Sequence, residues 1–237
     1  MLAARCCAVR HGAGMGIATR PPAEAIAPRP RLRGVSHRIA FFVALGAGVM
    51  LVARAGDRRA MAVTAIYATL LAGMFGVSAT LHRADWRGRA FNWLRRADHA
   101  MIFAFIAGTY TPLCVLGIGG PVGMRLLALS WTGAGLGILR ALLWPHAPRA
   151  VSSLLYVAVG WVVVAYFPEV RAALPPVAFG LVIAGGAWFT VGAAVYGTRW
   201  PDPWPRVFGF HEVFHVLIII GCACHFAAVA LVVASRG

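Results

Sequence analysis

The fold of this chain is decided by HEVFHVLIIIGCACHFAAVALVVA, residues 211–234. The stretch contains one carboxylate, that of Glu212, and no arginine or lysine. A run of about 20 apolar residues is long enough to cross a bilayer as an α-helix. The stretch opens with H-E-x-x-H, the pattern in which two histidines of one helix bind zinc and the glutamate acts as a base. It therefore predicts a transmembrane helix with metal-binding residues in its first turns.

The rest of the chain has the same apolar character. Of the 237 residues, 60% are hydrophobic and only 12% are charged, and the mean hydropathy is +0.77. A soluble domain carries about 25% charged residues. We therefore predict an all-α polytopic membrane protein with seven transmembrane helices. The six apolar runs that precede the last one cover residues 37–55, 60–82, 97–118, 123–144, 150–167 and 176–197.

The basic residues predict how the chain is oriented. All 22 are arginines, as is typical of GC-rich bacterial genomes, and the formal net charge is +15. The arginines lie between apolar runs, which indicates topology signals and not a nucleic-acid surface. Sixteen of the 22 fall in the N-terminal tail and in the loops on its side. Because positive charge is retained inside, we expect a cytoplasmic N-terminus, an external C-terminus and a bacterial plasma-membrane location.

Two regions of different composition divide the chain. Residues 1–34 are rich in proline and arginine and have no continuous apolar core, so we predict a flexible basic N-terminal tail and not a signal peptide. Residues 35–237 form the predicted seven-helix domain. The five cysteines include no CxxC pair, so neither a disulfide framework nor a thiolate zinc site is indicated.

Three histidines are predicted to meet at one membrane depth. His82 ends the second apolar run, while His211 and His215 begin the seventh, and the four crossings between these two ends bring the chain back to the same side of the membrane. Residues four apart share a helix face, so His211 and His215 can bind one metal together. Three imidazoles with water in a fourth position make an open zinc site of the catalytic type. We therefore predict Zn²⁺ on His82, His211 and His215.

Ser78 and Asp98 are expected beside this metal. Ser78 lies one turn from His82 on the same helix face, where it would orient the imidazole or hydrogen-bond the metal's water, or else bond back to its own helix. Asp98 begins the third run at the same depth. Three roles are open to it: fourth ligand, general base, or ion pair with Arg95 or Arg96.

The remaining ionisable residues receive structural predictions. His99 points about 100° away from its neighbour on a helix, and His225 lies about 15 Å deeper than the histidine pair. We predict that His225 is a satisfied buried histidine. Glu212 is expected to face Arg199 or Arg206 or the lipid headgroups. No acidic residue follows it to complete a protease site, so an intramembrane metalloprotease is disfavoured.

Four ordered motifs together resemble the hemolysin III family, the bacterial branch of the progestin and adipoQ receptors, which is similar to the alkaline ceramidases. The resemblance covers about residues 29–234. It implies seven helices, an inward N-terminus, zinc on the three histidines named above, and Ser78 and Asp98 close to the metal. The motifs are PRLRGVSH at 30–37, SATLH at 78–82, RRADHAMIFAFIAGTYTP at 95–112 and HEVFHVLIIIGCACHFAAV at 211–229.

The function expected from these features is zinc-dependent hydrolysis of an amide or ester bond in a membrane lipid. A buried metal with an open position motivates this hypothesis, because lipid-like substrates reach such a site easily. Two other classes stay open. One is a non-enzymatic regulator or receptor-like protein in which zinc is structural. The other is a cytolysin or pore, for which no row of pore-lining charges is visible.

Overall fold

The computed structural model describes residues 30–236 and shows a bundle of helices without a named strand in that range. Seven of its helical segments are long and apolar enough to cross a membrane, which confirms the predicted fold class. The helices are α1 Val35–Ala53, α2 Arg58–Arg83, α3 Gly88–Pro112, α4 Gly120–Leu143, α5 Arg149–Gly160, α6 Phe167–Ala173, α7 Pro176–Thr198 and α8 Phe210–Ala234.

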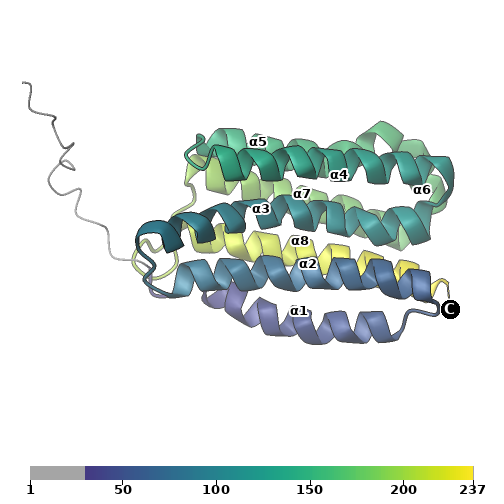
Figure 1. The fold of residues 1–237 in the computed structure, drawn as a ribbon, viewed down its shortest axis with the longest axis horizontal. Coiled ribbons are helices and arrows are strands. Elements are labelled where there is room, and N and C mark those ends of the chain that lie inside the picture. Colours follow the sequence, from purple (N-terminus) through teal and green to yellow (C-terminus); the bar gives the residue numbers. More distant parts are fainter. Residues whose placement is uncertain (1–29, 237) are drawn as a thin grey trace, which may run out of the picture.

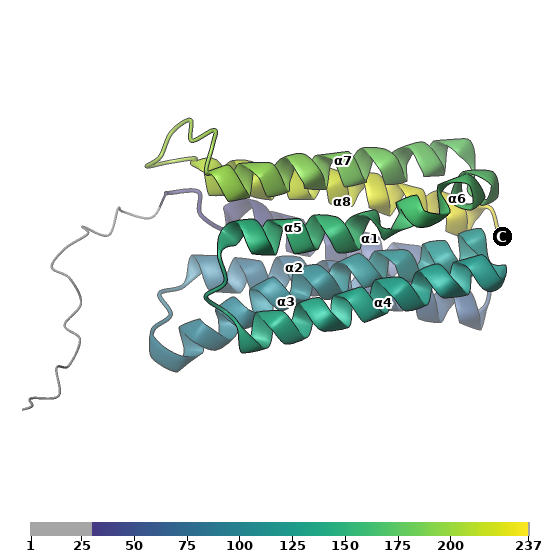
Figure 2. The same ribbon diagram turned by 90° about the horizontal axis from the view of Figure 1, so that it is seen from above.

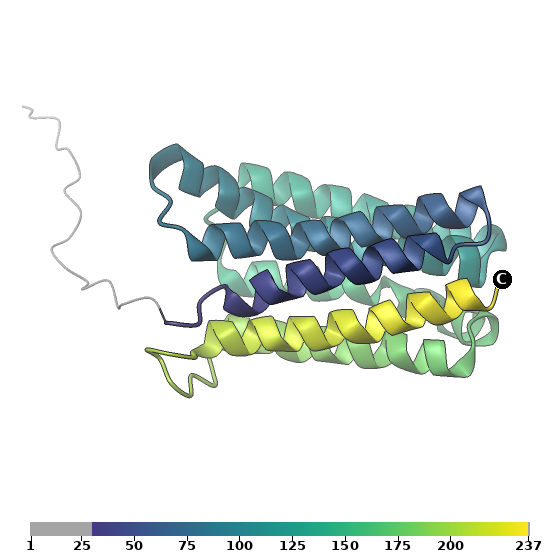
Figure 3. The same ribbon diagram turned by 90° about the horizontal axis from the view of Figure 1, so that it is seen from below.

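The bundle is built mainly from helices that follow one another in the chain. Helix α1 packs on α2, α2 on α3 and α3 on α4, while α7 packs on α8. Helix α8 also lies against α1 (Figure 3) and contacts α3, so the first and last spans are neighbours. The described N-terminal end and the C-terminus lie at opposite ends of the bundle (Figure 1), as an odd number of spans requires.

Two helix boundaries differ from the apolar runs. Helix α3 begins at Gly88, well before the apolar run at 97, because arginines at the end of a membrane helix can extend into the headgroup region. The fifth span is not one continuous helix. It consists of α5, a 3₁₀ segment Trp161–Tyr166 and α6, which Figure 2 shows as a bent path along the bundle.

The break in the fifth span is supported from α3. The Tyr110 hydroxyl donates to the Gly160 carbonyl at 2.6 Å and accepts a hydrogen bond from the Val163 amide at 3.1 Å. In lipid, backbone groups freed from a helix must find a partner inside the protein. Tyr110 therefore stabilises the irregular backbone and keeps it facing the interior of the bundle.

The chain that enters α1 is anchored to the loop between α7 and α8. The amide of Arg31 donates to the Arg206 carbonyl and that of Leu32 to the Val207 carbonyl, each at 3.1 Å. Residues 1–29 of the predicted tail lie outside the described residues, whereas its last residues are held in place by these bonds. As a result, α1 begins beside the first turn of α8.

Candidate metal centre

The three histidines predicted as zinc ligands do converge. His82 comes from the end of α2, and His211 and His215 come from the first turns of α8. One ring nitrogen of each lies within 4.8 Å of the others. The Nε2 atoms of His82 and His211 are 3.2 Å apart. Two helix ends far apart in sequence therefore present three nitrogen donors to one point.

The separation of the His82 and His211 nitrogens fits a tetrahedral metal. Zinc–nitrogen bonds of 2.0–2.1 Å place two ligand nitrogens about 3.3 Å apart, close to the separation of the His82 and His211 nitrogens. His215 is only 2% exposed, and its Nδ1 has no hydrogen-bond partner among the described residues. Three neutral imidazoles are also a donor set that suits zinc. The cluster can therefore hold such an ion.

A fourth histidine, His37 of α1, borders the cluster. Its ring lies parallel to that of His215, with 3.7 Å between centroids and 6° between planes. It is 4% exposed, and its Nδ1 is 2.9 Å from the Ser78 hydroxyl oxygen. The sequence reasoning assigned no role to His37, although it ends the PRLRGVSH motif. Its position at the start of an apolar run was the one available signal.

Ser78 has a different partner from those predicted. It is 5% exposed in α2, and its hydroxyl is hydrogen-bonded to the His37 ring, for which no role was predicted. Through His37 the serine contacts the stacked ring of His215. Ser78 therefore contacts His37, which in turn contacts His215, and so supports the three-histidine cluster indirectly.

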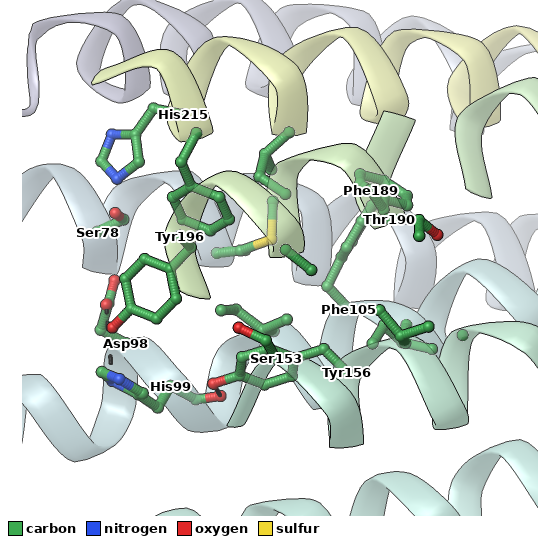
Figure 4. Close-up of a pocket in the computed structure, with 18 of the residues that line it drawn as sticks. Ser78, Asp98, His99, Phe105, Ser153, Tyr156, Phe189, Thr190, Tyr196 and His215 are labelled. Carbon is green, nitrogen blue, oxygen red and sulfur yellow. Dashed lines mark hydrogen bonds and ion pairs between the residues drawn. The ribbon is translucent and has the colours of Figure 1, made fainter. Parts of the chain in front are cut away.

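Asp98 stands apart from the three converging nitrogens. The group of residues that can share a metal among those described comprises the three histidines without Asp98. Asp98 pairs with its neighbour His99, at 3.9 Å, and no ion pair of Asp98 with Arg95 or Arg96 occurs within residues 30–236. Asp98 lines the same cavity as the cluster, with its side chain pointing toward Ser78 and Tyr196 (Figure 4).

The partner predicted for Glu212 was wrong. Its side chain is 2% exposed and pairs with Arg33, which precedes α1, and not with Arg199 or Arg206. Its other oxygen accepts a hydrogen bond from the Gly209 amide at 2.9 Å and caps α8. Both carboxylate oxygens are thus occupied. Glu212 holds the chain before α1 against α8 and is poorly placed to act as the base of a metalloprotease.

Gly34 lets the chain pass close to the cluster. It is the residue before α1 and has φ of 73°, in the left-handed region that favours glycine. A Cβ atom at this position would come within 2.8 Å of the His82 Cβ. The backbone entering α1 therefore packs directly on His82, and a larger residue would displace one of them.

His225 lies apart from the cluster, as predicted. Its Nε2 is 3.1 Å from the Val182 carbonyl oxygen of α7, a bond that satisfies one ring nitrogen. His99 also bonds to backbone, with its Nδ1 2.8 Å from the Arg95 carbonyl oxygen. Both histidines are therefore engaged within the protein and are not members of the three-histidine group.

A cavity of about 490 Å³ extends from the cluster into the bundle. Its inner wall is mainly apolar and aromatic, with residues from α3, α7 and α8. Figure 4 shows Phe105 and Phe189 in this part, and Asp98, Tyr196 and Ser153 nearer the histidines. One cavity thus joins a polar, histidine-bearing end to an apolar interior, which suits a molecule that is itself amphiphilic.

Comparisons with known proteins agree with this architecture. A family model described as Haemolysin-III related matches residues 26–226. Hemolysin-3 of Bacillus cereus is 27% identical over 198 residues, which are 82% of this chain and 87% of that protein. A Hemolysin-3 homolog of Bacillus subtilis (strain 168) is 28% identical over 65% of this chain and 69% of its own. Heptahelical transmembrane protein ADIPOR2 of Oryza sativa subsp. japonica is 29% identical over 65% of this chain and 74% of its own.

Proposed function

The chain belongs to the haemolysin III-related family of membrane proteins, and from that premise we propose that it is a zinc-dependent hydrolase of an amide or ester bond in a membrane lipid. The observation that supports the proposal most strongly is the convergence of three imidazole nitrogens at the polar end of an apolar cavity. Such a site combines a place for a metal with a place for an acyl chain.

His82, His211 and His215 would hold the metal. When bound, zinc supplies Lewis-acid polarisation of a carbonyl and makes water more acidic. The stacked ring of His37 restrains His215, and its bond to Ser78 fixes the orientation of that stack. Residues that orient metal ligands in this way are as much a part of such sites as the ligands themselves.

Asp98 is the residue best placed to accept a proton. Its carboxylate lines the cavity, has no arginine partner among the described residues and does not belong to the ligand group. Hydrolysis adds water across the C–N or C–O bond and yields a carboxylate and an amine or alcohol. Asp98 would take the proton of the attacking water and pass it to the leaving group.

The inner cavity would receive the acyl chain. Phe105, Phe189 and Ile218 line it, and an alkyl chain there gains about 0.8 kcal/mol for each buried CH₂ group. We further propose that the histidine end faces the cytoplasm, because most arginines lie at that end. Because these two similar proteins come from bacteria, the plasma membrane is the expected location.

Asp98→Asn tests the proposed chemistry. Zinc content, measured by mass spectrometry of purified protein, should stay at the wild-type level, because Asp98 is not among the ligands. Turnover of N-acyl lipids in detergent micelles should fall about 10²- to 10⁴-fold, the usual contribution of a general base. Unchanged turnover would remove Asp98 from the mechanism. Absence of turnover in the wild-type protein, with zinc bound, would favour a regulator in which the metal is structural.

A further inference from the structure

The charged residues that line the cavity are mostly positive. Three arginines, Arg33, Arg95 and Arg149, contribute to its wall, against the single carboxylate of Asp98. All four come from the end of the bundle that carries the histidine cluster, and the inner wall contains none of them. The polar end of the cavity therefore has an excess of guanidinium groups.

Two of the three arginines lack a carboxylate partner. Arg33 is neutralised by Glu212, and Asp98 pairs with His99. No ion pair of Arg95 or Arg149 with an acidic residue occurs within residues 30–236. A guanidinium that faces a cavity and is unpaired there is a ready partner for an anion, which it can bind through two parallel hydrogen bonds.

Contacts with the wall direct Arg149 toward the cluster. Its guanidinium carbon lies 5.8 Å from the centre of the Tyr196 ring, a cation–π contact. The Tyr196 ring in turn lies 6.1 Å from that of His211. Tyr196 thus bridges the arginine and one of the three clustered histidines. An anion held by Arg149 would sit next to the position proposed for the scissile bond.

Membrane topology alone does not account for the placement of Arg95, whereas Arg149, the first residue of α5, is exposed and also lines the cavity. Arginines that act only as topology signals can point into water, as the exposed Arg89 does in the first turn of α3. Arg95, less than two turns further along the same helix, is half-buried and faces the cavity. Arg96 instead lies over the Trp93 ring, at 5.1 Å, outside the cavity lining. Arg95 is therefore placed differently from its neighbours in α3.

We propose that Arg95 and Arg149 bind the anionic head group, a carboxylate or phosphate, of an amphiphile whose acyl chain fills the inner cavity. This inference rests on the proposed lipid hydrolysis and narrows its substrate class to lipids with a negatively charged head group. A neutral lipid would occupy the same apolar space but leave both guanidiniums without an anionic partner.

Binding of two matched lipid pairs tests the proposal. N-oleoylglycine and N-oleoylethanolamine share the chain and the amide and differ in a carboxylate. Oleoyl lysophosphatidic acid and mono-oleoylglycerol differ in a phosphate. Radiolabelled forms are titrated against the purified protein in dodecyl maltoside, with turnover recorded separately. In at least one pair the anionic member should bind about 10- to 100-fold more tightly, as expected for charge-assisted hydrogen bonds. The pair with the larger ratio identifies the anion.

Three variants test whether a preference for the anionic lipid arises from the cavity arginines. We expect the ratio of anionic to neutral lipid affinity to fall at least about threefold in Arg95→Gln and in Arg149→Gln. Arg89→Gln, an exposed matched control on α3, should leave this ratio unchanged. Equal binding within both pairs would overturn the proposal. The proposal would also be overturned if Arg89→Gln lowered the preference for the anionic lipid as much as Arg95→Gln does. The same holds if the preference disappeared when zinc is removed but persisted in both Arg95→Gln and Arg149→Gln. A preference that meets these criteria without any turnover would support the anion site while rejecting the hydrolase.

Discussion

Helix α8 carries histidines in two contrasting environments. His211 and His215, in its first turns, meet His82 of α2, and the ring of His215 stacks against that of His37 of α1. His225, deeper in the same helix, bonds to the Val182 carbonyl of the neighbouring α7. Both regions are apolar in sequence, so hydropathy does not distinguish them. The difference lies in what the neighbouring helices supply: further imidazoles at one end and a backbone carbonyl at the other.

This contrast separates two solutions to the same physical problem. An imidazole in a membrane helix is costly unless its polar atoms find partners. The structural histidine His225 bonds one carbonyl through its Nε2, while its Nδ1 has no hydrogen-bond partner among the described residues. At the other end, the Nε2 atoms of His82 and His211 face each other at 3.2 Å, and a ring nitrogen of His215 lies within 4.8 Å of the other two histidines. A metal ion bound by all three nitrogens would satisfy them together. We therefore expect substitutions at the two ends of α8 to have very different consequences.

The largest expected effect is loss of metal from His211→Ala. Zinc affinity should fall more than about 100-fold, because loss of a direct ligand costs more than loss of a residue that only orients one. Zinc retained after dialysis against a weak chelator measures this. His225→Leu is the matched control on the same helix and should retain wild-type zinc. Equal zinc loss in the two variants would abolish the contrast between the two ends of α8.

Glu212→Gln should destabilise the protein while leaving the three clustered histidines His82, His211 and His215 intact. The substitution leaves Arg33 without its buried partner, although the amide oxygen can still accept from Gly209. The expected loss of unfolding free energy is about 2 kcal/mol. Denaturation in mixed micelles measures it, with Arg199→Gln as an exposed control. If Glu212→Gln instead abolished turnover at unchanged stability, the glutamate would have the role of a protease base after all.

Ser78→Ala should weaken zinc binding about tenfold without abolishing it. The change removes the partner of the His37 Nδ1, so the ring stacked on His215 loses its fixed orientation. Competition with a fluorescent chelator gives the affinity. Thr80→Ala is a matched control, because its hydroxyl bonds to the Gly76 carbonyl on an exposed part of the same helix. Identical affinities for the two variants would show that the serine does not support the cluster.

The smallest effect is expected for His225→Leu. Removal of its bond to Val182 should lower the free energy of unfolding by about 0.6 kcal/mol, the mean for hydrogen bonds between membrane helices. Thermal unfolding in detergent is the appropriate measurement. A loss of several kcal/mol would mean that His225 has further partners and that the two regions of α8 are less different than described.

Much of the fold follows from the sequence, because the length and hydropathy of each apolar run indicate a transmembrane span. The common membrane depth of His82, His211 and His215 was also predictable, since the number of crossings between two helix ends decides whether they lie on the same side; that the three side chains meet is shown by the structure. The break between Gly160 and Phe167 was not, because an apolar run has the same composition in an α-helix and in a 3₁₀ segment. Only the Tyr110 hydroxyl reveals where the irregular backbone is satisfied.

The contacts of α1 were the main omission. His37 and Arg33 lie at the border between the N-terminal tail and the first apolar run, so the sequence does not show whether their side chains are inside the bundle. Their roles depend on how α1 is rotated against α2 and α8, and helical periodicity says which residues share a face but not which neighbour that face meets. The Arg33–Glu212 pair and the stack of His37 on His215 therefore appear only in three dimensions.

X-ray absorption at the zinc edge tests the central claim most directly. The purified protein should bind one zinc per chain, and its spectrum should fit three imidazole nitrogens at about 2.0–2.1 Å with one further oxygen or nitrogen donor. The His211→Ala protein should show no such site. A spectrum dominated by oxygen or sulfur donors, or a wild-type protein that binds no zinc after reconstitution, would contradict the account.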